Sequence, residues 1–166
     1  MNQLFLNLLS VFLSSSLLLA QGQPIRATGD EMPVIRETTT ATLPTTYTGR
    51  QILVGSGGGV TGFSTTYYLL ENGKLFGRRS RDTTFTFIGQ QTATNTKRVF
   101  SVAESKCKLK TAKFDHPGNV YTFIEWKKGK QEHKVAWGAT GKVVPANYKQ
   151  FYNSFMAMIP APSRLN

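Results

Sequence analysis

Glycine dominates one short stretch of the sequence, residues 55–62, which reads GSGGGVTG. Gly57, Gly59 and Gly62 follow the G-x-G-x-x-G spacing of dinucleotide-binding turns, in which the backbone approaches a pyrophosphate at the start of a helix. The short apolar run 51–54 before them has the composition of the strand that such a turn requires. The same glycines equally suit a wide loop or bulge between two strands, because glycine adopts positive φ and lets another chain come close.

The residues after the glycines discriminate between these interpretations. A dinucleotide-binding enzyme requires residues 60–72 to be helical, whereas FSTTYYLL at 63–70 consists mainly of the Thr and aromatic types that favour strands. The Gly-Lys-Ser/Thr triplet of a P-loop does not occur. We therefore expect no cofactor, and we expect a loop whose unpaired N–H and C=O groups are available to a partner protein. The residues of this partner-binding loop are Gly57, Gly58, Gly59, Val60, Thr61, Gly62 and Phe63.

Residue types that carry catalysis or bind metals are sparse in this sequence. The two histidines, His116 and His133, stand in a turn and at the start of a strand, with no nucleophile–base motif around them. Together with the single cysteine, Cys107, they are too few for a closed structural zinc site. Cys107 lies among apolar residues with helical spacing, so we expect it to be a small buried hydrophobe. The sequence therefore predicts a protein that is not an enzyme and has no metal site.

Basic residues exceed acidic ones by eleven, with 20 Lys and Arg against nine Asp and Glu. Between residues 71 and 149 sixteen basic residues stand against six acidic ones, so the excess belongs to the folded part. Such a charge attracts anionic partners, and it is equally typical of a solvated surface that aids solubility. In the first interpretation two clusters bind an anionic polysaccharide or lipid surface: Arg78, Arg79 and Arg81, and Lys127, Lys128 and Lys130.

The first twenty residues form an uncharged, Leu-rich run that ends in Leu18-Leu19-Ala20. This run is short for a membrane-spanning helix and matches the apolar core and small-residue cleavage site of a secretory signal peptide. Residue 21 is Gln rather than the Cys that would carry a lipid anchor. We expect cleavage near Ala20, export to the periplasm or the medium, no transmembrane segment in the mature chain and no nucleic-acid partner.

The remaining chain divides into a linker, one domain and a short tail. Residues 21–49 are rich in Thr and Pro, which predicts a flexible linker, while residues 50–160 form the domain and 161–166 the tail. Strands are expected at 51–54, 63–70, 75–76, 83–88, 120–126 and 133–137, and helices at 95–109 and 145–159. The order β-β-β-β-α-β-β-α predicts an α+β fold with a mainly antiparallel sheet and two helices packed on one face.

Two local signals sharpen this layout. Asn72-Gly73 lies between two of the expected strands and predicts a type I′ hairpin turn. Thr94 or Asn95 is expected to cap the first helix, and Pro145 is expected in the first turn of the second.

Residues 52–63, ILVGSGGGVTGF, and 67–75, YYLLENGKL, resemble small, largely uncharacterised envelope proteins of Gram-negative bacteria. Those proteins have a GGF-T-G loop, an ENGK hairpin and a WG pair near the final helix, which Trp137-Gly138 matches here, and the resemblance covers most of residues 50–159. The GG-x-T-G core also resembles the emfourins, small proteinaceous inhibitors of thermolysin-like metalloproteases. Val60 stands where the pattern usually has an aromatic residue.

The emfourin resemblance implies that residues 57–62 are presented to a protease or another partner. We therefore expect an exported, non-catalytic binding protein, a protease-inhibitor-like module that acts through the glycine-rich loop. The alternative is a basic envelope or surface protein that binds anionic glycan or lipid headgroups. The two differ in their response to salt, because charge-driven adhesion weakens steeply with ionic strength.

Overall fold

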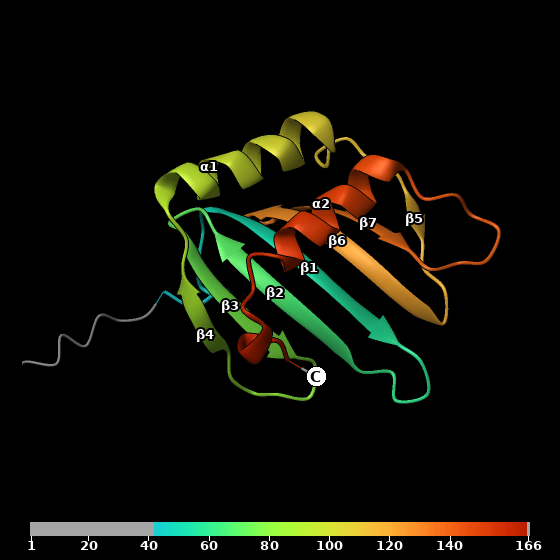
Figure 1. The fold of residues 1–166 in the computed structure, drawn as a ribbon, viewed down its shortest axis with the longest axis horizontal. Helices are drawn as coiled ribbons and strands as arrows, with labels where there is room; N and C mark the ends of the chain where they lie inside the picture. Colours follow the sequence, from blue (N-terminus) through green and yellow to red (C-terminus); the bar gives the residue numbers. More distant parts are fainter. Residues whose placement is uncertain (1–41, 166) are drawn as a thin grey trace, which may run out of the picture. The chain divides into compact units, whose positions relative to one another are not determined.

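The computed structural model describes residues 42–165, and the predicted signal peptide and the predicted linker up to residue 41 lie outside the described residues. Seven strands form one sheet, in the spatial order β4-β3-β2-β1-β6-β7-β5 (Figure 1). The strands are β1 (Arg50–Gly58), β2 (Ser64–Leu70), β3 (Lys74–Arg79), β4 (Thr86–Gln90), β5 (Asp115–His116), β6 (Val120–Lys128) and β7 (Gln131–Trp137). All neighbouring strands are antiparallel except β5, which pairs with β7 in parallel.

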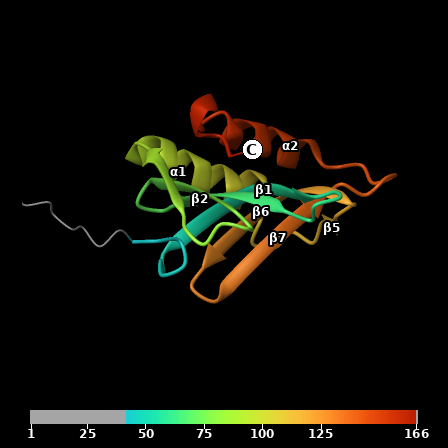
Figure 2. The same cartoon turned by 90° about the horizontal axis from the view of Figure 1, so that it is seen from below.

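Two longer helices and two short turns complete the described fold. Helix α1 (Ala93–Ser101) continues into a π-helical segment η1 (Val102–Lys106), and α2 (Ala146–Met156) is followed by a 3-10 turn η2 (Ala161–Ser163). Both longer helices cover the same face of the sheet, and the other face carries none of the described helices (Figure 2). The prediction of an α+β fold with two helices on one face of a mainly antiparallel sheet is confirmed.

The hydrophobic core lies between this helical layer and the sheet. Alternate strand residues point toward the helices, as Ile52 and Val54 do from β1, and both are fully buried. The helices contribute Val99 and Phe100 from α1 and, at the i, i+4 spacing of one helix face, Phe151 and Phe155 from α2. One face of α2 lies in this core, which explains the apolar stripe in its sequence. The start of β1 also lies in the core, which explains its apolar residues.

The opposite face of the sheet, which we call the open face, has a smaller apolar cluster. Leu53, Phe123 and Ala136 are buried there, with Tyr68 and Tyr121 packed against them. The described end of the predicted linker reaches the sheet, because the buried side chain of Gln51 donates hydrogen bonds to the carbonyl oxygens of residues 44 and 47 at 3.0 and 3.1 Å. The predicted tail also contacts the domain, since the Leu165 N–H donates to the Tyr67 hydroxyl at 2.8 Å.

One local prediction is confirmed and two are corrected by the structure. Residues 64–70 are a strand, as expected for 63–70, so the helix that a dinucleotide-binding enzyme requires over 60–72 is absent there. The turn at Asn72-Gly73 is not of type I′, because only Gly73 of the pair has positive φ (86°). The cap of α1 is Thr92, whose side chain accepts the Asn95 N–H, rather than Thr94 or Asn95.

Two smaller differences concern the ends of the helices. Pro145 occupies the N-cap position of α2, one residue before the helix proper. The first helix ends at residue 106 rather than 109, after a last turn that is π-helical.

Candidate functional site

The glycine-rich residues form one end of the sheet, where β1 turns into β2. Strand β1 runs to Gly58 and β2 begins at Ser64, so the connecting loop is residues 59–63. Three backbone hydrogen bonds hold it: the Gly58 N–H donates to Phe63 O at 3.0 Å, Gly62 N–H to Gly59 O at 3.2 Å and Gly59 N–H to Asn119 O at 2.7 Å. The loop therefore has a fixed shape set by main-chain contacts. We call residues 57–63 the hairpin tip.

Positive φ angles make glycine necessary at the base of the tip. Gly58 has φ of 93°, and a Cβ built on it would overlap the carbonyl oxygen of Asn119. Gly62 has φ of 64°, but a Cβ there would meet no other atom within 4 Å. Gly58 is thus constrained by conformation and by space, whereas Gly62 is constrained by conformation alone.

Two of the glycines, Gly55 and Gly57, are explained by close packing around strand β1 rather than by the exposed surface of the tip. A Cβ on Gly55 would lie 2.7 Å from the ring of Phe123, and one on Gly57 would lie 2.9 Å from the hydroxyl of Tyr121. Both rings belong to β6, the neighbour of β1, and they occupy the space above the strand that side chains would otherwise fill. Part of the glycine cluster is therefore explained by aromatic packing on the open face.

The side chains of the tip are exposed. Val60 is fully exposed and Phe63 is 48% exposed, although both are apolar. Thr61 is exposed as well, and its hydroxyl oxygen accepts the Phe63 N–H at 3.4 Å. Two apolar side chains are therefore exposed on one short loop.

A pocket of about 340 Å³ lies beside the tip. It brings the tip together with the turn after β3, since Arg79 and Arg81 line it along with Phe63 and Val120. The Arg81 guanidinium lies 5.6 Å from the centre of the Phe63 ring, a cation–π contact. Arg79 forms an ion pair with Asp82 at 2.9 Å, and the hydrogen bond from Arg79 is the main cause that lowers the pKa of this carboxyl.

The two predicted basic clusters lie at opposite ends of the sheet. Arg79 pairs with Thr65 near the hairpin tip, while Arg78 points to the open face, with its guanidinium 4.7 Å from the centre of the Phe85 ring. Lys127 and Lys128 pair with the first two residues of β1 at the other end, and Lys130 lies in the turn after them. Only the arginine cluster adjoins the predicted binding loop.

The charged end of the sheet, where β1 begins, contains a network that sequence reasoning did not find. Glu104 of η1 accepts hydrogen bonds from the Trp126 indole N–H at 2.8 Å and from Arg50 Nη1 at 3.1 Å, and it pairs with Lys110 Nζ at 3.2 Å. Arg50 also pairs with Glu71 at 2.7 Å. The sequence separations, 54 residues between Arg50 and Glu104 and 22 between Glu104 and Trp126, leave no local motif to recognise.

These contacts shift the pKa values of both carboxyl groups. Hydrogen bonds from Arg50 lower the pKa of Glu71. For Glu104 burial acts in the opposite direction, but the donors Trp126, Lys110 and Arg50 outweigh it and lower the pKa. Both groups are therefore held as carboxylates, which fits a structural role at this end.

The residues weighed for catalysis lie elsewhere and in different surroundings. His116 packs edge-on against Phe114 at 4.8 Å between ring centres, and His133 lies 5.9 Å from Trp126. Cys107 is buried, as predicted, and burial raises the pKa of its thiol to about 11. Within residues 42–165, no three His, Cys, Asp or Glu side chains gather as metal ligands would.

Comparison of the sequence with protein-family models finds no match, and comparison with curated proteins finds no significant match. Among the described residues, no helix is long and apolar enough to cross a membrane.

Proposed function

We propose that this protein is an exported, non-catalytic binding protein that docks on another protein through the hairpin tip, in the manner of a protease inhibitor. The observation that carries the proposal is the exposure of Val60 and Phe63 on a loop whose backbone is fixed by its own hydrogen bonds. A loop that is already ordered loses little conformational entropy when a partner covers it. The exposed apolar side chains then supply the favourable burial.

The chemistry of the adjoining pocket supports binding rather than catalysis. The ionisable side chains that line it are Arg79 and Arg81. A guanidinium orients carboxylates and carbonyl oxygens through its fixed fork of N–H donors. Arg79 is already paired with Asp82, so Arg81 is the residue we expect to orient an anionic group of the partner. The partner surface that is complementary to the tip and its pocket has an apolar subsite surrounded by acidic or carbonyl groups.

A protease is the partner class that the faint resemblance to the emfourins suggests. A tip of fixed shape suits this role, because a loop that lies in a peptidase cleft without relaxing resists cleavage. Two backbone hydrogen bonds within residues 58–63 and a third from Gly59 to Asn119 support this role, because they hold the loop in one shape.

The experiment is a titration of the purified protein against a panel of secreted proteases that includes thermolysin-like enzymes. The decisive variant is Val60→Asp, because residue 60 has no packing role in the fold. Val143→Asp is the matched control, since Val143 is 90% exposed in the different loop that joins β7 to α2. Substitutions of Gly58 are unsuitable here, because they would disturb the fold as well as the surface.

We expect inhibition of at least one protease, a loss of tenfold or more with Val60→Asp and unchanged inhibition with Val143→Asp. No inhibition of any protease at micromolar protein would remove the inhibitor part of the proposal. Equal inhibition by both variants would show that the tip is not the docking surface.

A second candidate function, adhesion to an anionic glycan, is favoured by the positive balance of residues 71–149. The test is retention on immobilised heparin between 50 and 300 mM salt. Adhesion through cations predicts elution that shifts steeply with salt and weakens when Arg81 or Lys130 is replaced by Ser. Protein binding through Val60 and Phe63 predicts little dependence on salt.

A further inference from the structure

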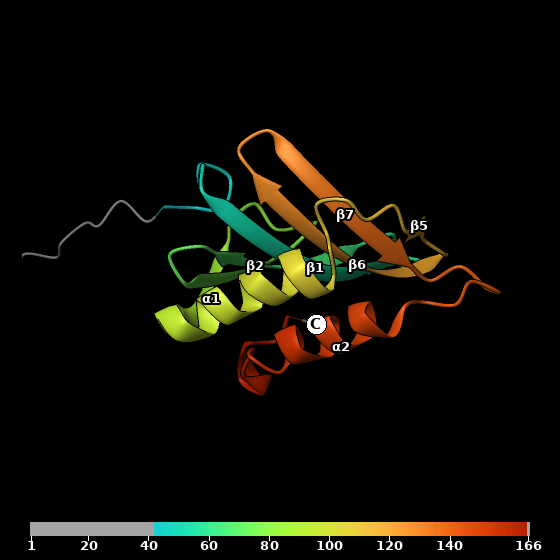
Figure 3. The same ribbon diagram turned by 90° about the horizontal axis from the view of Figure 1, so that it is seen from above.

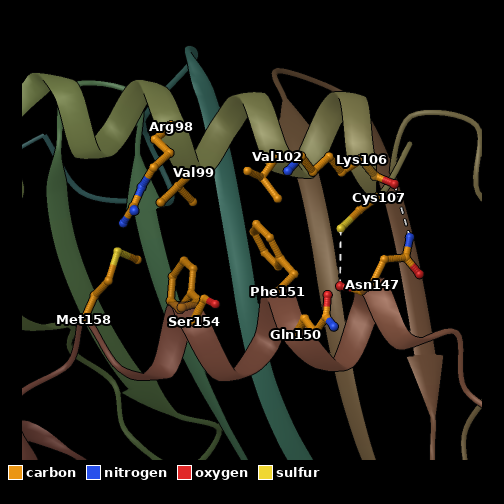
Figure 4. A pocket seen from close by; sticks show the side chains of 11 residues that line it. Arg98, Val99, Val102, Lys106, Cys107, Asn147, Gln150, Phe151, Ser154 and Met158 are labelled. Atoms are coloured by element: carbon orange, nitrogen blue, oxygen red, sulfur yellow. Dashed lines mark hydrogen bonds between the residues drawn. The ribbon is translucent and has the colours of Figure 1, made fainter.

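A groove runs between the two helices on the covered side of the sheet, away from the hairpin tip. Helix α1 with η1 and helix α2 lie side by side (Figure 3). Hydrogen bonds tie them at one end, where Asn147 Nδ2 donates to Lys106 O at 3.2 Å, and at the other, where Asn95 Nδ2 donates to the Met158 sulfur at 3.1 Å. Between these ties the helices are separated by a cavity of about 360 Å³ (Figure 4).

Apolar side chains line the groove from both helices. Val99 and Val102 line it from the first helix, and Phe151, Phe155 and Met158 line it from the second. From residue 95 to residue 106 the helical rise of 1.5 Å per residue gives a length of about 16 Å. A long, narrow, apolar space of this kind fits an extended alkyl chain, and its volume lies in the usual range of ligand pockets.

The rim of the groove is cationic. Arg98 and Lys106 line it, and its other polar lining residues, Asn147, Gln150 and Ser154, are uncharged. The first turns of α1 and α2 contain no acidic residue. The acid of η1, Glu104, is engaged by Arg50, Lys110 and Trp126. The charge next to this apolar space is therefore positive and is complementary to an anionic headgroup.

Arg98 is the better placed of the two cations. Its Nη2 donates to Asn95 Oδ1 at 2.8 Å, and this hydrogen bond holds the guanidinium at the Met158 end of the groove (Figure 4). A guanidinium in a fixed position can donate two parallel hydrogen bonds to a carboxylate. The headgroup site is thus at the Arg98 end, and the chain extends from there toward Cys107.

The π-helical segment gives independent support. In η1 the Cys107 N–H bonds to Val102 O, the i to i+5 pattern, at 3.0 Å. Such wide turns are rare and are frequently found at functional sites. Here the wide turn lies along the wall of the groove, where it carries Val102, Lys106 and Cys107.

We propose that this inter-helical groove binds a single-chain fatty acid, with the alkyl chain between Val99, Val102 and Phe151 and the carboxylate on Arg98. The proposal is independent of the hairpin tip, which lies at the far end of β1 and shares no lining residue with the groove. The protein would then carry a small amphiphile as well as bind a partner.

The test is isothermal titration of the purified protein with octanoate, decanoate and dodecanoate below their micelle concentrations. Each added CH₂ should tighten binding by about fourfold, because a buried CH₂ contributes about 0.8 kcal/mol. Arg98→Gln should weaken dodecanoate binding by tenfold or more, since the variant loses a charged hydrogen bond. Lys149→Gln, which removes an exposed charge of α2 outside the groove, should leave binding unchanged.

A steric variant tests the location. Ser154→Trp places a ring in the groove and should abolish binding, whereas Asn153→Trp, at the neighbouring exposed position that does not line the groove, should not. Absence of saturable binding, or dodecanoate affinity unchanged by Ser154→Trp, would overturn the proposal. Dodecanol binding as tight as dodecanoate would overturn the role of Arg98, and binding only to phosphatidylglycerol vesicles would overturn the single-chain ligand.

Discussion

At the charged end of the sheet, the stabilising contacts are made by side chains. At the hairpin tip, they are hydrogen bonds of the backbone. Glu104, Arg50 and Trp126 come from η1, β1 and β6, and charged hydrogen bonds join them. The tip is held by main-chain hydrogen bonds and by glycine conformations that other residues do not adopt easily. Strand β1 connects the two ends, since it begins at Arg50 and ends at Gly58.

The two ends of β1 are therefore stabilised by different kinds of contact. Contacts between side chains join η1 to β1 and β6 at the charged end. Contacts made by the backbone leave the side chains of Val60 and Phe63 exposed at the tip. The comparison yields four predictions on stability, in decreasing order of expected effect.

The largest effect is expected from Gly58→Ala. The new Cβ would overlap the carbonyl oxygen of Asn119 while the residue holds positive φ, so the free energy of unfolding should fall by about 3 kcal/mol or more. Gly62→Ala is the matched control, because it has similar φ but open space, and it should cost about 1 kcal/mol. Urea unfolding of both variants measures the difference, and equal losses would mean that crowding at Gly58 is not what fixes the tip.

The next effect is expected at the charged end from Glu104→Ala. It leaves the indole of Trp126 and the guanidinium of Arg50 without this acceptor, so the free energy of unfolding should fall by about 2 kcal/mol. Glu104→Gln keeps an acceptor for the indole and should lose less. Glu132→Gln, which removes a carboxylate 3.8 Å from Lys127 at an exposed site, should lose at most about 0.5 kcal/mol. A Glu132 effect as large as that of Glu104 would contradict a special role for the network.

Acid should weaken the charged end, whereas the hairpin tip itself, residues 57–63, contains no carboxyl group to titrate. The folded-state pKa values of Glu71 and Glu104 lie below the ordinary value of 4.5, so the unfolded chain takes up protons first as the pH falls. The stability that these carboxylates contribute is present above about pH 4.5 and is lost progressively below it. Urea midpoints between pH 6 and 3 should fall less steeply for Glu104→Gln than for the parent chain. Gly62→Ala should follow the parent's slope, and a changed slope there would couple the tip to the network.

The smallest effect, with the opposite sign, concerns Glu125 on the open face between the two ends. Burial, followed by the nearby charge of Glu132, raises the pKa of this carboxyl. A raised folded-state pKa means that ionisation at neutral pH opposes folding, so Glu125→Gln should stabilise the protein at pH 7 by a few tenths of a kcal/mol. The gain should vanish below pH 4.5, where Glu is protonated in both states. A variant less stable than the parent at pH 7 would show that the cross-strand neighbour Lys134 is the dominant partner.

Local patterns in the sequence were sufficient for the secondary structure of several elements. The Thr and aromatic content of 63–70 predicted β2 correctly, and the stripe that contains Phe151 and Phe155 predicted α2. These features depend on neighbours in sequence or on a single hairpin, which is why they can be read locally.

Features that depend on distant partners escaped prediction. Strand β1 was expected to end at residue 54 but continues to Gly58, because the backbone of its second half pairs with β2 on one side and with β6 on the other. The Glu104 network and the inter-helical groove likewise need the packing of segments that lie far apart in the chain. The fold class could be inferred from local patterns, whereas the surroundings of the tip required the three-dimensional arrangement.

Cys107 is chemically unreactive in the folded protein. Its sulfur points toward the Asn147 carbonyl oxygen at 3.7 Å, and with a pKa of about 11 it remains a thiol at neutral pH. Alkylating reagents and disulfides react with thiolates, so they do not modify Cys107 while the protein is folded. A cysteine introduced at position 60 would therefore accept a fluorophore or cross-linker selectively, and the label would report directly on what approaches the tip.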